Sequence, residues 1–214
     1  GSGVNLFTGD AEFSVPLGVI GGNNGLSYVV SASYSSNVQS EVDENNEFAP
    51  TGALGLGWSL DYPQIIRDDK DTGTMSDDAF YLEQGRQRTK LTRTGSFHDD
   101  VSNSDHARYT AEGSPLWQIT LNDSEKTWTI ITEDGMKYQY GSDNSCTTDC
   151  ANQYGVKWGN WIGPSKYGTS NDGAQPYVVA YNLAKIIEPW GDELTFYYDN
   201  TQRSIGANGL TYTR

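Results

Sequence analysis

The segment 54–60 constrains the fold of this chain most strongly, because Gly55 and Gly57 alternate with leucines and lead directly into Trp58. In a β-strand successive side chains point to opposite faces, so the large residues share one face and the glycines leave the other nearly bare. Glycine within a strand marks a bulge or the close approach of another backbone. We therefore expect Gly55, Gly57 and Trp58 to serve close packing between β-layers.

Composition supports the same architecture. The 214 residues include 24 Gly, 14 Tyr and 6 Trp, a usage typical of secreted β-proteins, and they are numerous enough to bury a core. The formal net charge of −14 disfavours nucleic acid and anionic membranes as partners, because an acidic surface repels phosphate groups. No run approaches the ~18 apolar residues that a membrane span requires.

Apolar and polar residues alternate along most of the chain, which predicts an all-β fold. We expect antiparallel multi-stranded sheets, arranged as a sandwich or as an open barrel that begins a shell, with long loops and little or no helix. Residues 1–3 resemble a tag remnant, and 4–214 are expected to form a single domain. The segments 93–114 and 141–176 are expected to be loops, the first including an edge strand.

Two hairpins have clear turn signals. Asp134 and Gly135 form a dipeptide typical of a two-residue hairpin loop. The segment 177–199 is expected to be a second hairpin, with a type I turn that places Pro189 second and Gly191 fourth.

Several segments occur in the same order in a known family: Asn5-Leu6-Phe7-Thr8-Gly9, 13–17, 26–36, 54–60, 80–82, 134–138 and 181–186. Together they resemble the N-terminal region of RHS/YD-repeat proteins. They are also similar to the B components of insecticidal toxin complexes and to proteins of the plasmid virulence protein B type. Within 177–199, the spacing G-x4-F-x-Y-D of one YD repeat is matched by Gly191, Phe196, Tyr198 and Asp199.

In that family repeated β-hairpins wind into a hollow shell that can enclose a C-terminal toxin or effector. The resemblance implies a non-catalytic structural domain of a secreted protein, which starts or caps such a shell and has the downstream repeat segment as its partner. Docking of the next repeat would fall to the four residues that match the YD spacing. The family's self-cleaving protease motif and its effector are absent from this sequence, so neither activity is implied.

The titratable residues also argue against an enzyme. The two histidines, His98 and His106, both lie in the polar segment 93–114, and no Gly-x-Ser-x-Gly motif is present to supply an activated serine. Carboxylates are abundant throughout, so no pair of them indicates glycoside hydrolysis. We interpret both histidines as exposed loop residues.

A carbohydrate-binding module is the alternative function. Aromatic rings flanked by amides suit sugars, and the predicted loop 141–176 contains Trp158, Asn160, Trp161 and Tyr167. The competing interpretation is that these rings pin a long loop onto the sheet.

Two smaller features remain. Cys146 and Cys150 are expected to form a disulfide in an oxidising compartment, the alternative being a reduced, inert pair. Asp69, Asp71 and Asp77 suggest a calcium loop, although their spacing misses the EF-hand pattern and a solvated acidic turn competes with it. No other cofactor is expected.

Overall fold

The computed structural model describes residues 2–4, 11–21, 26–36, 57–72, 75–84, 87–95, 106–141, 155–162, 174–198, 202–205 and 210–213. The chain divides into two compact units, Gly1–Tyr62 with Asp199–Arg214 as the first and Pro63–Tyr198 as the second. Each unit is described by itself. Whether the two units together form the single domain predicted over 4–214 is not tested by this division, so that prediction stays a prediction.

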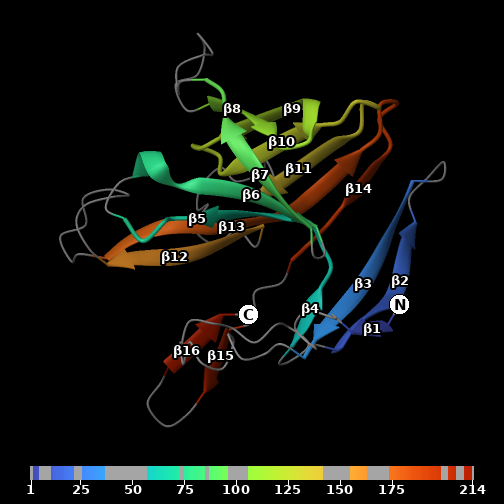
Figure 1. The fold of residues 1–214 in the computed structure, drawn as a ribbon, viewed down its shortest axis with the longest axis horizontal. Coiled ribbons are helices and arrows are strands. Elements are labelled where there is room, and N and C mark those ends of the chain that lie inside the picture. Colours follow the sequence, from blue (N-terminus) through green and yellow to red (C-terminus); the bar gives the residue numbers. More distant parts are fainter. Residues whose placement is uncertain are drawn as a thin grey trace. The chain divides into compact units, whose positions relative to one another are not determined.

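The second unit is an eight-stranded closed barrel (Figure 1). Neighbouring strands are antiparallel, and β13 closes the ring because it pairs with β5 through Ile65↔Tyr181 and with β11 through Tyr138↔Ile186. The strands of the ring are β5 (Gln64–Asp68), β6 (Ala79–Gln84), β7 (Gln87–Arg93), β8 (His106–Ala111), β9 (Ser114–Asn122), β10 (Thr127–Ile131), β11 (Lys137–Gly141) and β13 (Ala174–Ile187).

The predicted all-β antiparallel fold is confirmed, with a closed barrel where the sequence favoured a sandwich or an open one. Two further strands pair with β13: β12 (Val156–Ile162) and β14 (Glu193–Thr195). Among the described residues the helical structure is a single 3-10 turn, η2 (Met75–Asp77). No helix in the described part of the chain is long and apolar enough to cross a membrane.

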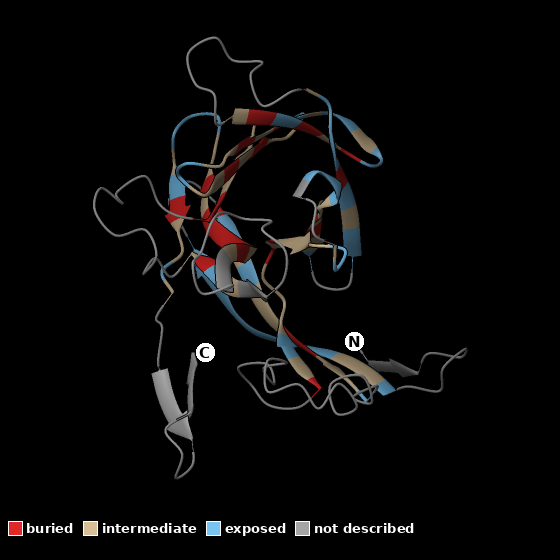
Figure 2. Ribbon diagram, turned by 90° about the vertical axis from the view of Figure 1, so that its left-hand side faces the viewer, coloured by how far each residue is buried: buried red, intermediate tan, exposed pale blue. Residues whose placement is uncertain are grey.

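Aromatic side chains from four strands fill the barrel. The indole of Trp128 on β10 is fully buried, and its ring centroid lies 5.0 Å from Phe80, 4.7 Å from Tyr109 and 6.0 Å from Tyr181. An eight-stranded barrel has an interior just wide enough for side chains to fill. Figure 2 shows the buried residues distributed along the strands that ring this core.

The first unit contains a four-stranded antiparallel sheet, β1 (Ser2–Val4), β2 (Ala11–Gly21), β3 (Ser27–Ser35) and β4 (Trp58–Leu60), in that order. An aromatic cluster ties three of its strands together, since Phe13, Tyr34 and Trp58 have ring centroids 5.1 to 5.4 Å apart. The strands β15 (Gln202–Ile205) and β16 (Leu210–Thr213) form a separate antiparallel pair.

In the described part of the strand predicted over 54–60, Trp58–Leu60 form the strand and Gly57 does not. Gly57 adopts a φ of 76°, a left-handed conformation that favours glycine, and it lies in a turn immediately before β4. Gly57 therefore serves the turn, and the described strand begins at Trp58. Gly55 lies outside the described residues.

Two segments predicted to be loops contain strands. Residues 106–111 form β8, which pairs with both β7 and β9, so this segment is an internal barrel strand rather than an edge strand. His106 begins this strand and is half-buried, which corrects its assignment to an exposed loop. Trp158, Asn160 and Trp161 lie on β12 rather than in a loop.

We expect Trp128→Ala to lower the free energy of unfolding of the barrel by about 3 to 5 kcal/mol, because it removes the indole at the centre of the aromatic core. Trp190→Ala is the matched control: the Trp190 side chain is 79% exposed, and its loss should cost at most about 0.5 kcal/mol. Urea unfolding followed by far-UV circular dichroism measures both variants. Equal destabilisation by the two substitutions would contradict the packing described here.

The barrel should also lose stability in alkali. Burial raises the pKa of Tyr109 from 10.0 to about 12. Its stabilising contribution is therefore complete below pH 10 and is lost as the pH rises towards 12. Between about pH 8 and about pH 11 the wild-type protein should lose about 1 kcal/mol more than Tyr109→Phe in urea unfolding. Tyr197→Phe, at an exposed ring, is the control, and a Tyr109→Phe profile parallel to that of wild type would refute the prediction.

Candidate functional site

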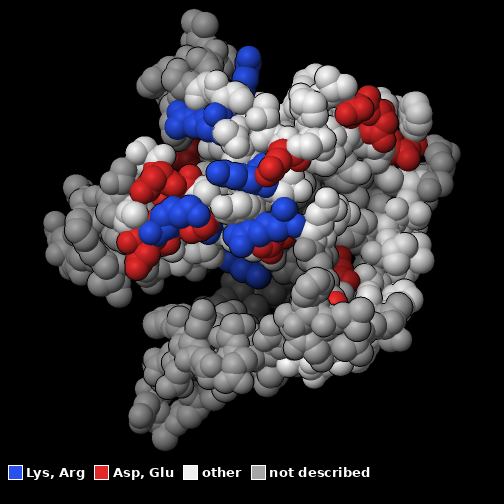
Figure 3. All heavy atoms as spheres, in the orientation of Figure 1, with Lys and Arg blue, Asp and Glu red and all other residues white. Residues whose placement is uncertain are grey.

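Charge is unevenly distributed over the chain. Between Glu12 and Glu41 the sequence carries no charged side chain, and this stretch contains most of β2 and all of β3. In the view of Figure 3, Lys and Arg side chains gather instead over the barrel wall of the second unit, interleaved with Asp and Glu. An uncharged hairpin on an otherwise acidic protein is the feature that most needs a functional explanation.

Apolar side chains on one face of this hairpin lie open to solvent. Val19 and Val29 are paired across β2 and β3, and they are 67% and 53% exposed. Leu17, in the bulge between Pro16 and Gly18, is exposed as well. Cross-strand pairs of β-branched residues normally contribute to a packed face, which this part of the hairpin lacks.

The opposite face is exposed only in part, because Tyr28 and Val30 are half-buried and Ala32 is buried. Val15 and Ile20 lie on that other face and are exposed. β1 pairs only with the first residues of β2, from Ala11 to Phe13, and β4 pairs with β3 only from Ala32 to Tyr34. No described strand pairs with the outer edge of β2 from Gly18 to Gly21 or with that of β3 at Val29 and Val30, and Asp61 donates a backbone hydrogen bond to Ser31. Among the described residues, the distal hairpin is thus a two-stranded ribbon with one exposed apolar face, that of Val19 and Val29.

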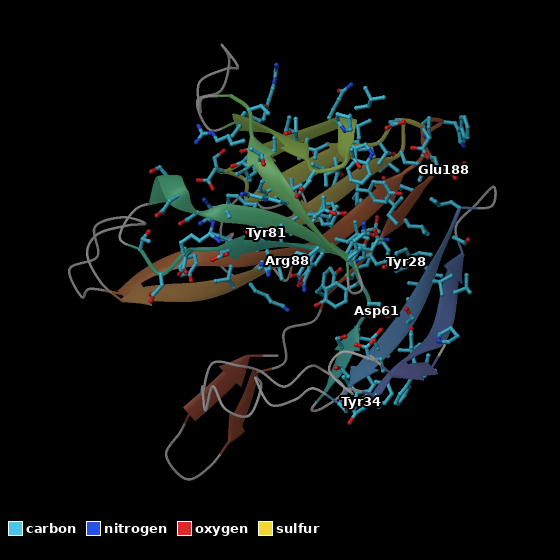
Figure 4. The ribbon with its side chains drawn as sticks, viewed as in Figure 1. Tyr28, Tyr34, Asp61, Tyr81, Arg88 and Glu188 are labelled. Atoms are coloured by element: carbon cyan, nitrogen blue, oxygen red, sulfur yellow. The ribbon has the colours of Figure 1, made fainter. Side chains whose placement is uncertain are left out.

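The hairpin is also held by a set of hydrogen bonds to Asp61 from Tyr28, Ser31 and Ser33, which we call the polar clamp. Figure 4 labels Tyr28 and Asp61. One Asp61 carboxylate oxygen accepts hydrogen bonds from the hydroxyls of Ser31, at 3.0 Å, and Ser33, at 2.6 Å. The Tyr28 hydroxyl donates to the Asp61 carbonyl at 3.2 Å. Burial, followed by the nearby Asp61 charge, raises the pKa of Tyr28 to about 12. The clamp fixes where the hairpin leaves the sheet.

The β13–β14 hairpin contains the residues that match the YD spacing. Gly191 donates its N–H to the Glu188 carbonyl at 2.9 Å with a φ of 98°, which confirms the predicted turn. Phe196 donates its backbone N–H to Ala184, and the Tyr198 hydroxyl donates to the Leu183 carbonyl at 2.6 Å. These bonds tie the residues after β14 back to β13. Asp199 lies outside the described residues, and the docking role of this set stays a prediction.

The barrel wall carries paired charges. The Arg88 guanidinium lies 4.0 Å from the centre of the Tyr81 ring and 3.4 Å from the Glu83 carboxylate, measured from Nε. Lys70 donates to Asp68, and this hydrogen bond is the main cause that lowers the pKa of the Asp68 carboxyl. Each of these cations is therefore engaged by a carboxylate, which is typical of a solvated protein surface.

The predicted metal ligands make other contacts. Asp69 accepts a hydrogen bond from the Tyr177 hydroxyl at 2.9 Å, and Asp77 accepts one from Thr72 at 2.7 Å. Asp71 donates its backbone N–H to the Asp69 side chain. Within the described residues no three acidic, histidine or cysteine side chains are grouped as a metal site. The calcium hypothesis remains a prediction.

The remaining predicted sites rest on side chains that the structure does not describe. Cys146, Cys150 and Tyr167 lie outside the described residues, so the disulfide stays a prediction. The backbone of β12 places Trp158, Asn160 and Trp161 opposite Val178, Pro176 and Gln175 of β13. Carbohydrate binding by these residues also stays a prediction.

Sequence reasoning missed the exposed hairpin surface of Leu17, Val19 and Val29. The alternation predicted these strands but not which face is covered, and Val19 and Val29 are open to solvent. The available signal was the absence of charge between Glu12 and Glu41, which exposed strands normally break with lysine or glutamate.

No family model matches the chain, and no curated protein matches it. Solved structures are similar to it in fold. One is the N-terminal domain of effector protein SpvB from Salmonella typhimurium strain LT2, with a TM-score of 0.52 and 15% identity over 94% of this chain and 61% of that chain. Another is TcdB2-TccC3, with a TM-score of 0.54 and 14% identity over 100% of this chain and 10% of that chain.

The TcdB2-TccC3-Cdc42 structure is similar to a comparable degree, with a TM-score of 0.51 and 15% identity over 96% of this chain and 9% of that chain. The likeness is one of fold. At 14 to 15% identity it shows that this chain has a fold found in the N-terminal domain of SpvB and in TcdB2-TccC3. The chain spans 61% of the SpvB domain and about a tenth of TcdB2-TccC3.

Asp61→Ala should loosen the junction between β3 and β4, since it leaves the hydroxyls of Ser31 and Ser33 without their shared acceptor. Removing the partner of part-buried polar groups costs about 1 to 3 kcal/mol. The Ser35 amide, which donates to Gly57, should exchange its hydrogen on the order of tenfold faster by mass spectrometry or NMR. Ser59→Ala, at an exposed residue of β4, is the control. Unchanged exchange in Asp61→Ala would show that the clamp is dispensable.

Proposed function

We propose that this chain is a non-catalytic structural β-domain from the N-terminal part of a secreted RHS/toxin-complex-like protein, in which it starts or caps a β-shell. Its partner is then the repeat segment that follows in the same parent polypeptide. The observation that carries the proposal is the fold likeness over 94% of this chain to the N-terminal domain of effector protein SpvB.

The share of TcdB2-TccC3 that the chain covers supports a role within a larger assembly. All of this chain aligns with 10% of that chain, so the same fold occurs there as a small part of a long polypeptide. A fold alone does not determine function, which is why the chain's own surface must agree with it.

The surface of the β13–β14 hairpin agrees with this role. Tyr197 is exposed although the residues on both sides of it, Phe196 and Tyr198, are half-buried against the barrel. Trp190 at the hairpin turn is exposed as well, with its indole N–H donated to the Glu188 carboxylate at 2.8 Å. Tyr197 lies one residue before the end of this unit, where an exposed aromatic ring suits the docking of a following hairpin.

The barrel interior supports a structural rather than a catalytic role. It is filled by Trp128, Tyr181, Phe80 and Tyr109, so aromatic rings occupy the space that a ligand takes in larger barrels. The carboxyls with a lowered pKa have structural partners, Lys70 for Asp68 and Thr132 for Asp134. Neither carboxyl has the raised pKa that a general acid requires near neutral pH.

Removing this chain from its parent protein should expose the repeat segment to protease, because the cap of the shell is lost. We expect limited digestion with trypsin to degrade the repeat segment faster, and separately expressed chain, added back, to restore protection. A parent polypeptide without β-repeats after this chain, or an identical digestion pattern with and without it, would refute the proposal.

A further inference from the structure

The loop between β10 and β11 contains an Asp-Gly dipeptide, a sequence at which a polypeptide backbone isomerises readily because glycine offers little steric hindrance. Thr132 donates its N–H to the Met136 carbonyl at 2.9 Å, and Gly135 donates its N–H to the Thr132 carbonyl at 2.9 Å. Gly135 has a φ of 82°, in the left-handed region. The loop between Thr132 and Met136 therefore has three residues with glycine last, one residue more than the dipeptide predicted.

Isomerisation of such a dipeptide proceeds through a cyclic succinimide. The Gly135 nitrogen loses its proton and forms a bond to Cγ of the protonated Asp134 carboxyl, which loses its hydroxyl group as water. Water then opens the succinimide at either of its two carbonyls. Opening at the main-chain carbonyl leaves Asp134 joined to Gly135 through its side chain, as isoaspartate. The reaction releases one water and takes up another, so it needs no oxidant and leaves the mass of the chain unchanged.

Hydrogen bonds hold both of the groups that must react. One Asp134 carboxylate oxygen accepts a hydrogen bond from the Thr132 hydroxyl and one from the Met136 backbone N–H, the latter at 3.3 Å. The Gly135 N–H is occupied by the Thr132 carbonyl. A Cβ added to Gly135 would lie 3.1 Å from Cγ of Pro189, so the loop also packs against the turn between β13 and β14. Attack of the Gly135 nitrogen on Asp134 requires these contacts to loosen.

The protonation state of Asp134 acts in the same direction. The hydrogen bond from the Thr132 hydroxyl, followed by that from the Met136 backbone, lowers the pKa of the Asp134 carboxyl. Only the protonated carboxyl releases water readily, so a lowered pKa reduces the reactive fraction at neutral pH. Asp134 is exposed, and solvent therefore has free access to a succinimide once it forms.

We propose that Asp134 and Gly135 are a latent site of backbone isomerisation in this protein and that Thr132 holds the site in its unreactive form. Isoaspartate places an additional carbon atom in the backbone of the loop, so the hydrogen bonds between Thr132 and Met136 lose their register. Ile130 and Tyr138 pair across the same hairpin, and Ile130 is buried in the barrel. Conversion of Asp134 therefore destabilises two adjacent strands of the barrel.

The test follows isoaspartate at residue 134 during long incubation of the folded chain at neutral pH. Trypsin releases the site in the peptide 127–137, and liquid chromatography with electron-transfer fragmentation separates and identifies the isoaspartyl form. Thr132→Val keeps the branched side chain and removes its hydroxyl. We expect the rate to rise about tenfold, the factor that corresponds to one lost hydrogen bond to a charged group. Thr132→Ser retains a hydroxyl, and its rate should stay within about twofold of wild type.

Two controls separate the local effect from a general loss of stability. Ser124→Ala removes a hydroxyl from the exposed turn between β9 and β10, where it donates to the Asn122 side chain at 2.8 Å, and it should leave the rate at Asp134 unchanged. Ile65→Val creates a small cavity in the barrel core away from the loop and should lower the free energy of unfolding without a tenfold gain in rate.

A second Asp-Gly dipeptide, Asp172-Gly173, lies outside the described residues and serves as the reference for the unfolded chain. In concentrated urea, Asp134 should isomerise at a rate comparable to that of Asp172 and much faster than in the folded chain. An equal rate for Asp134 in folded and unfolded wild type would show that the loop gives no protection and would overturn the inference. It is also overturned if Thr132→Val reacts at the wild-type rate, or if Ile65→Val reacts as fast as Thr132→Val.

Discussion

The second unit depends on the packing of Trp128 against rings from three other barrel strands. Phe80, Tyr109 and Tyr181 come from β6, β8 and β13, so this one contact set joins strands around the whole ring. The interior of an eight-stranded barrel admits little more than such side chains, and close packing there gives each ring many dispersion contacts. Closure by β13 and filling of the core are linked, since Tyr181 both contacts Trp128 and pairs with Ile65 of β5.

A buried ion pair sits beside this core. Arg67 and Asp78 have side chains that are 9% and 3% exposed, with Nε and the carboxylate 3.8 Å apart, and the Arg67 guanidinium lies 4.9 Å from the centre of the Phe80 ring. Such a pair adds little net stability but makes the loss of either partner costly. This pair joins β5, which carries Arg67, to Asp78 in the connection just before β6.

The four-stranded sheet of the first unit leaves part of its apolar surface exposed. Its sheet is held at one end by the aromatic cluster of Phe13, Tyr34 and Trp58 and by the Asp61 clamp, whereas the distal hairpin leaves valines in water. Exposed apolar area of this kind gains free energy when it is covered, at about 25 cal/mol per Å². The barrel buries its own core, whereas in the described part of the first unit the side chains of Val19 and Val29 stay exposed.

The sequence by itself determined the local structure. Alternation predicted the strands around Trp128 and the β2–β3 ribbon, and the Pro189 and Gly191 positions predicted their turn, because strand periodicity and turn geometry depend on neighbouring residues. It failed for β8 and β12, where small or polar residues hide the alternation that pairing imposes. Only the tertiary structure decided that the barrel closes and that Val19 and Val29 stay exposed, because closure and burial depend on contacts between segments far apart in the chain.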